Sequence, residues 1–136
     1  SEVFIEKAER GDWSDWVTEE QSRAIYTASI MAKVKWTAKA DRLFDNYVFN
    51  AFLEYGQKTS HKRMQERIVF ADSVAKYPES YTPEALLSDR KHQYRSCRIM
   101  RRFKIIHYYA KSSNTVHIVD IWDTRMNPER LRRRIK

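Results

Sequence analysis

The chain contains one cysteine, Cys97, among its 136 residues, and a lone thiol cannot form an internal disulfide. A chain of this length buries enough surface to fold without a disulfide or a structural metal. A single unpaired thiol is typical of a reducing compartment, so we expect a cytoplasmic protein. We expect Cys97 to be a small core residue and not a nucleophile.

Glycine, metal-ligand spacings and long apolar runs are also scarce. The only glycines are Gly11 and Gly56, which excludes a glycine-rich phosphate loop. The four histidines show no ligand spacing, so we expect no metal and no cofactor. No apolar run approaches the roughly 20 residues that span a bilayer, and no leader-like segment is visible, so we expect no membrane partner.

Charge of one sign predominates. The formal net charge is +8, but residues 1–30 contain seven acidic and three basic side chains, a charge of −4, so residues 31–136 carry +12. A basic body favours an acidic partner, most often a nucleic-acid backbone. The alternative is that the charge serves only solubility, as in a structural subunit.

The pattern changes at Met31, where residues 31–37 alternate as a first strand does. Thr37 is placed to cap a helix with apolar residues at three-four spacing up to Tyr55, and Gly56 is placed to end it. We expect a second helix to begin at Ser60 and to stop before Pro78. Its predicted inward residues are Met64, Ile68, Ala71, Val74 and Ala75.

Three strands are predicted after an irregular connection over residues 78–90. They cover residues 94–101, 103–110 and 115–123, with a turn at 111–114 before the last. Asn127-Pro128 then opens a short cationic helix. Consecutive strands with short turns are antiparallel, so we predict an α+β fold. It comprises a strand, a helical hairpin, an antiparallel sheet of three to four strands and a basic C-terminal helix.

Residues 1–30 form a separate acidic segment in this interpretation. Its apolar residues fit one or two short helices around Gly11, which would be marginal alone. We expect Trp13 and Trp16 to anchor the segment on the basic body, formed by residues 31–136. The alternative is an ordinary N-terminal extension of the domain.

Candidate chemistry lies in a cationic stretch over residues 90–107, interleaved with tyrosine and phenylalanine. Arginine and tyrosine together can grip phosphates and stack bases, whereas the alternative is a solvated sheet edge protected by positive charge. His107 or His117 could act as a general base, although a histidine in a strand is more often packed. Asp120 and Asp123 lie three apart on a strand, which argues against a paired-carboxylate hydrolase.

Several motifs, in order, resemble the RelE/ParE superfamily of bacterial toxins over about residues 32–130. They are the opening strand at residues 33–37, "Tyr94-Arg95", the central strand "Arg102-Phe103-Lys104-Ile105-Ile106-His107-Tyr108-Tyr109" and the closing "Asp123-Thr124-Arg125-Met126-Asn127-Pro128". The resemblance implies a toxin of a type II toxin–antitoxin pair. Its implied partners are an antitoxin, in an oligomeric complex, and a cellular target.

Two routes to toxicity follow from the resemblance. RelE-type relatives cleave mRNA on the ribosome with arginines, lysines and a terminal tyrosine or histidine, whereas ParE-type relatives block DNA gyrase through their surface. Here Asp123 and Thr124 stand where the proton-transfer residue is expected. If the chain is a ribosome-dependent endoribonuclease, the implied catalytic residues are Arg95, Arg102, His107, Tyr108 and Arg125.

Six further basic side chains of the strands and the C-terminal helix are the predicted nucleic-acid or target surface, namely Arg98, Arg101, Lys104, Arg132, Arg133 and Arg134. The acidic, amphipathic residues 1–30 have the properties of an antitoxin segment, so they are a candidate built-in inhibitor. A different class of protein also fits the sequence: a non-toxic basic module that binds RNA or DNA through the same sheet. The sequence leaves the choice between gyrase and the ribosome open.

Overall fold

The computed structural model describes residues 18, 20, 21 and 30–136. The chain divides into two units, Ser1–Met31 and Ala32–Lys136, and the fold below is that of the second unit. The expected helices around Gly11, with the predicted anchors Trp13 and Trp16, lie outside the described residues. No helix among the described residues is long and apolar enough to cross a membrane.

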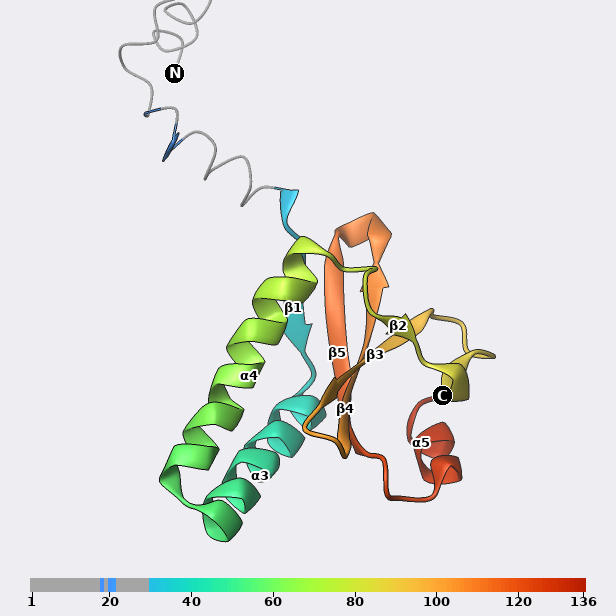
Figure 1. Ribbon diagram of the computed structural model, residues 1–136. Helices are drawn as coiled ribbons and strands as arrows, with labels where there is room; N and C mark the ends of the chain where they lie inside the picture. Colours follow the sequence, from blue (N-terminus) through green and yellow to red (C-terminus); the bar gives the residue numbers. More distant parts are fainter. Residues whose placement is uncertain (1–17, 19, 22–29) are drawn as a thin grey trace, which may run out of the picture. The chain divides into compact units, whose positions relative to one another are not determined.

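One mixed sheet is covered by helices on both faces (Figure 1). In chain order the elements are β1 (Lys33–Trp36), α3 (Ala38–Tyr55), α4 (Gln57–Lys76), β2 (Thr82–Pro83), η1 (Ala85–Leu87), β3 (Tyr94–Ile99), β4 (Phe103–Ala110), η2 (Lys111–Ser113), β5 (Thr115–Asp123) and α5 (Pro128–Arg134). The α3–α4 hairpin packs on one face, and η1 and α5 lie on the other. The predicted α+β class is confirmed.

The strand order is β1-β5-β4-β3-β2, which adds two features to the prediction. β1 pairs in parallel with β5, and the connection between them is long, since it runs through the helical hairpin and then through β2, β3 and β4. β2 pairs only Thr82 and Pro83 with β3. A proline has no backbone N–H, so it is tolerated at this edge but hides the strand from sequence analysis.

The two long helices meet at Gly56 without a loop. Thr37 caps α3 by accepting a hydrogen bond from the Ala40 amide at 3.1 Å, as predicted. Gly56 has φ of 91° and ends α3, also as predicted. The predicted start of α4 at Ser60 is wrong, because Gly56 turns the chain within one residue and Gln57 already begins the helix.

The main core lies between the hairpin and the sheet. Phe44 and Tyr47 of α3, with Phe70 of α4, pack on Ile105 and Ile118 of the central strands. A second cluster fills the opposite face, where the sheet residues Tyr94, Ile106 and Trp122 pack under Leu87, Leu131 and Ile135. The short helix α5 therefore owes its position to tertiary packing and not to helix propensity.

Several residues predicted to face inward are exposed. Met64 is 54% exposed and Ile68 is 70% exposed, so their predicted burial is wrong. The apolar residues of both helices form two stripes, and only the stripe with Phe44 and Phe70 meets the sheet. The exposed apolar residues that line a groove along the other side of the two helices form the hairpin patch, defined as Phe49, Phe52, Met64 and Ile68.

His107 lies in the core and is fully buried. Its ring packs edge-on against Phe70 and Tyr81, with centroids 5.2 and 5.4 Å away. Its Nδ1 lies 3.4 Å from the Ile105 carbonyl, and its Nε2 has no hydrogen-bond partner in the described structure. Burial lowers the pKa of His107 from the usual 6.5 to about 4, so the neutral ring is the native form.

This burial predicts an acid-sensitive contribution to stability. The unfolded chain takes up a proton on His107 near pH 6.5 but the native state does not, so the stabilisation is complete above that pH and is lost as pH falls to about 4. The loss should be roughly 3 kcal/mol. The unfolding free energy of the His107→Phe variant, measured by chemical denaturation, should therefore fall less than that of the wild type over this pH range. The exposed His61→Gln is the control. Parallel pH profiles for wild type and His107→Phe would contradict the assignment.

Candidate functional site

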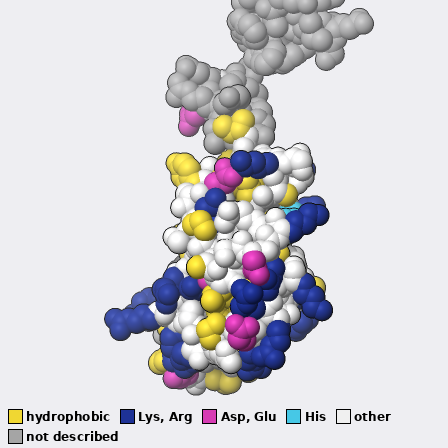
Figure 2. Space-filling view, turned by 90° about the vertical axis from the view of Figure 1, so that its right-hand side faces the viewer, with side chains coloured by type: hydrophobic (Ala, Val, Ile, Leu, Met, Phe, Trp, Pro, Cys, Tyr) yellow, Lys and Arg dark blue, Asp and Glu magenta, His cyan; other side chains and the backbone are white. Residues whose placement is uncertain are grey.

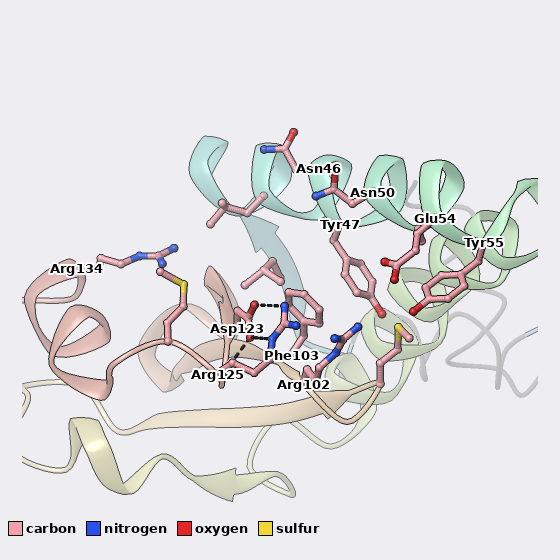
Figure 3. A pocket seen from close by; sticks show the side chains of 15 residues that line it. Asn46, Tyr47, Asn50, Glu54, Tyr55, Arg102, Phe103, Asp123, Arg125 and Arg134 are labelled. Carbon is pink, nitrogen blue, oxygen red and sulfur yellow. Dashed lines mark hydrogen bonds and ion pairs between the residues drawn. The ribbon is translucent and has the colours of Figure 1, made fainter.

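A cavity of about 510 Å³ opens between α3 and the end of the sheet (Figure 3). α3 forms one wall, and the start of β4, the end of β5 and the segment leading to α5 form the other. Its polar lining is Asn46, Tyr47, Asn50, Glu54, Tyr55, Arg102, Asp123, Arg125 and Arg134. We call this cavity the α3 pocket.

The α3 wall presents a ladder of hydrogen-bonding side chains. Asn46, Asn50 and Glu54 are spaced four residues apart, so they follow one face of the helix. Beside them the Tyr47 hydroxyl donates to Glu66 at 2.9 Å. Burial and then the Glu66 carboxylate raise the pKa of Tyr47, so this phenol keeps its proton at neutral pH.

Asp123 and Arg125 form a closed ion pair on the opposite wall. The Arg125 guanidinium donates to both carboxylate oxygens, at 3.1 and 2.7 Å, and the Arg125 amide donates to Oδ1 at 3.0 Å (Figure 3). These hydrogen bonds lower the pKa of Asp123 and raise that of Arg125. Asp123 therefore stays ionised and is a poor proton donor at neutral pH.

Arg102 is the open cation of the α3 pocket. Its carbonyl accepts hydrogen bonds from the Thr124 amide and hydroxyl at 2.6 and 2.9 Å, which fix its backbone beside the end of β5. Its side chain lies beside Phe103, below Tyr47 (Figure 3). Its guanidinium forms no ion pair with any residue that the structure describes, so it remains available for an anion.

Arg134 lines the same pocket but is held by a buried carboxylate. Its guanidinium donates to Asp120 at 2.5 Å and lies 5.2 Å from the centre of the Trp122 ring. Lys39, in the first turn of α3, lies 3.7 Å from the other oxygen of Asp120. Burial raises the pKa of Asp120, and the two cations oppose this effect. Asp120 thus ties α5 to β5 and α3.

A β-bulge places Asp120 in this position. Ile106 of β4 pairs with Asp120, and the next residue, His107, pairs with Ile118. Val119 is therefore an extra residue in β5. The bulge lies just beyond the point where β1 ends, since Trp36 pairs with Ile118.

The predicted catalytic residues are separated by the fold. Only Arg102 and Arg125 line the α3 pocket. Arg95 donates to the Tyr81 carbonyl at 2.7 Å and so supports a loop. His107 is enclosed in the core, where a substrate cannot reach it. Tyr108 packs with the cluster on the opposite face of the sheet from the hairpin.

Many of the predicted surface cations serve the fold. Lys104 pairs with the buried Glu84 at 3.0 Å. Arg132 donates to the Leu86 carbonyl at 2.8 Å and pairs with Asp89 at 3.1 Å, which fixes α5 to the η1 loop. The remaining predicted surface residues, Arg98, Arg101 and Arg133, are exposed, and basic side chains are spread over the face shown in Figure 2.

Sequence reasoning missed the α3 wall of the pocket. The available signal was the i, i+4, i+8 spacing of Asn46, Asn50 and Glu54 next to the apolar stripe. Within the described residues, no group of three or more potential ligands is placed to hold a metal ion. The pocket can offer a cation and several hydrogen-bonding groups to an anionic or polar partner.

Comparison with known proteins supports the fold through structure alone. No protein-family model matches the chain, and no curated protein matches it. Among solved structures, a chain described as "Chromosomal ParDE TA system from P. aeruginosa" is similar at a TM-score of 0.55 and 17% sequence identity. The match covers 68% of this chain and 96% of the other.

The buried pair at Asp120 predicts a large effect from a small substitution. Asp120→Asn keeps the size of the side chain but leaves Arg134 and Lys39 without their counter-charge. We expect a loss of about 3 kcal/mol of unfolding free energy in urea. Asp123→Asn removes a carboxylate from a pair with the exposed Arg125 and should cost less than about 1 kcal/mol. Equal losses of unfolding free energy in the two variants would show that the buried ion pairs of Asp120 do not hold α5 and α3 to the sheet.

Proposed function

We propose that this chain is the toxin of a toxin–antitoxin pair. The resemblance of its ordered motifs to the RelE/ParE superfamily and the fold match to a chain of a ParDE toxin–antitoxin structure support this proposal independently. The match spans nearly the whole of the other chain, with 96% of it covered. A third support is the hairpin patch, which suits a covering partner.

The hairpin patch is the proposed antitoxin site. Its residues Phe49, Phe52, Met64 and Ile68 are exposed and line a shallow groove between two antiparallel helices. A contiguous exposed apolar surface of this kind marks an interaction site in a monomeric protein. An amphipathic helix can bury its own apolar stripe in such a groove, and an acidic polar face would suit the +12 charge of residues 31–136.

For the toxic action, we propose the route that does not cleave RNA, namely inhibition of DNA gyrase. One observation carries this choice: three of the five residues expected to form a nuclease site are engaged in the fold. Arg95 holds a loop carbonyl, His107 is enclosed in the core, and Arg125 is paired with Asp123. A nuclease needs open cations and a proton-transfer group around one phosphate.

Ribosome-dependent mRNA cleavage is the second candidate, and the α3 pocket favours it. Arg102 is open there, and Glu54 lies close enough to Arg125 to raise its pKa, which places a carboxylate and cations around one cavity. A carboxylate could accept a proton while Arg102 stabilises the phosphorane-like charge. The non-toxic nucleic-acid-binding module remains the alternative from another class.

A paired assay on one preparation distinguishes these functions. The full chain should inhibit supercoiling by purified gyrase and leave mRNA intact in a translation extract. mRNA cleavage that is abolished in Arg102→Ala would favour the nuclease, because one catalytic cation contributes about 3 kcal/mol. Neither effect, together with normal growth on expression, in both the full chain and its Trp13→Ala, Trp16→Ala variant would favour the non-toxic module.

If the antitoxin binds the hairpin patch, substitutions there should abolish antitoxin binding and leave the toxicity of the chain intact. Phe49→Lys with Ile68→Lys places charge in the hairpin patch without touching the α3 pocket. Growth arrest by this variant should persist, and co-expression of an antitoxin that neutralises the wild-type chain should no longer restore growth. Lys58→Glu, an exposed change at the start of α4, serves as control and should remain neutralised. Full rescue of the double variant would contradict this location.

Residues 1–30 are proposed as an additional inhibitory segment on the basis of their sequence. Their charge of −4 is opposite to that of the rest of the chain. Trp13→Ala with Trp16→Ala in the full chain should then increase growth inhibition, because buried aromatic anchors commonly contribute roughly 2 kcal/mol or more. The measurement is growth at matched protein level. Unchanged growth would show that the tryptophans have no inhibitory role.

A further inference from the structure

A row of ring side chains crosses the sheet on the face opposite the hairpin. Tyr94 of β3 pairs directly with Tyr108 of β4, and Tyr108 pairs with His117 of β5. His117 in turn pairs with Lys35 of β1. Residues paired directly across strands share a face, so these four side chains form one lateral row.

The rings in this row are stacked. The His92 ring, just before β3, lies 4.0 Å from the Tyr108 ring at an interplanar angle of 7°. The His117 ring lies 4.9 Å from Tyr108 at 21°. β3 and β5 flank β4 on opposite sides, so Tyr108 has one imidazole on each side. Tyr94 meets Tyr108 edge-on and supports it from the buried cluster.

The row lies beyond the part of this face that α5 and η1 cover. Those elements close over Ile106 and Trp122, whereas His92 and Lys35 are exposed and Tyr108 and His117 are half-buried. We define the ring row as His92, Tyr108 and His117. At about 4.8 Å between strands, the distance from His92 to Lys35 is roughly 15 Å, which has room for a few nucleotides.

The surroundings of the ring row are positive. Lys33 and Lys35 of β1 alternate with the core-packed Val34 and Trp36, so both lysines lie on the face of the ring row. Lys33, Lys35 and Lys91 are exposed, and none forms an ion pair with a residue that the structure describes. Burial, Lys35 and His92 all lower the pKa of His117, so its ring is neutral at pH 7.

We propose that the ring row and its flanking lysines bind single-stranded nucleic acid. The outer faces of His92 and His117 take unpaired bases in a continued stack, and Lys33, Lys35 and Lys91 contact the phosphates. A base inside a duplex presents no free face to such a row, so the site selects single strands. This site is separate from the α3 pocket and does not rest on the proposed toxin function.

Fluorescence anisotropy with the full chain tests the proposal. The probes are a labelled mixed-sequence single-stranded RNA, the single-stranded DNA of the same sequence, and the corresponding DNA duplex. At least one of the two single strands should bind at least about tenfold more tightly than the duplex. Only the unpaired bases of a single strand can stack on the rings, and this stacking adds to the attraction between lysines and phosphates. Preference between RNA and DNA identifies the natural ligand.

Matched variants separate stacking from general charge. His92→Ala should weaken single-strand binding about tenfold, whereas His61→Ala, an exposed histidine on α4, should leave it unchanged. Lys33→Gln with Lys35→Gln should reduce the slope of log affinity against log salt by about 1.4, and Lys58→Gln should not change it. Equal binding of duplex and single strands, no binding of either single strand, or equal losses in variants and controls would overturn the proposal.

Discussion

The buried carboxylate of Asp120 is the constraint on which the arrangement of this domain depends. A bulge in β5 brings it to a position without solvent, and Arg134 and Lys39 supply the counter-charge. An unpaired charge there would be strongly destabilising, so the C-terminal helix and the first turn of α3 are both held against the sheet. Arg134 can then line the α3 pocket from the side of α5.

Several other basic residues also stabilise the fold. The charge of +12 suggests a broad cationic surface, yet much of it stabilises the fold: Arg90 and Arg132 donate to backbone carbonyls around α5, and Lys104 neutralises Glu84. The cations that form no ion pair in the described structure include Arg102 in the α3 pocket and the lysines beside the ring row. Charge counted from a sequence therefore overstates the surface that is free for a partner.

The sequence predicted the fold class well because local signals were strong. Thr37 and Gly56 mark the ends of α3, and strand alternation with a short turn marks the sheet. It could not predict which apolar stripe faces the core, because both stripes of the hairpin have helical spacing, as the exposure of Ile68 shows. The functional site was harder to predict than the fold. The α3 pocket combines residues from distant segments of the chain, and the bulge at Val119 has no clear sequence signature.

The proposed inhibition of growth through gyrase, without cleavage of RNA, can be tested in cells. The most direct measurement is plasmid topology and mRNA integrity in the same growing cells after brief induction of the full chain. The account predicts loss of negative supercoiling while transcripts stay full length. Cleaved transcripts with normal plasmid supercoiling would contradict it.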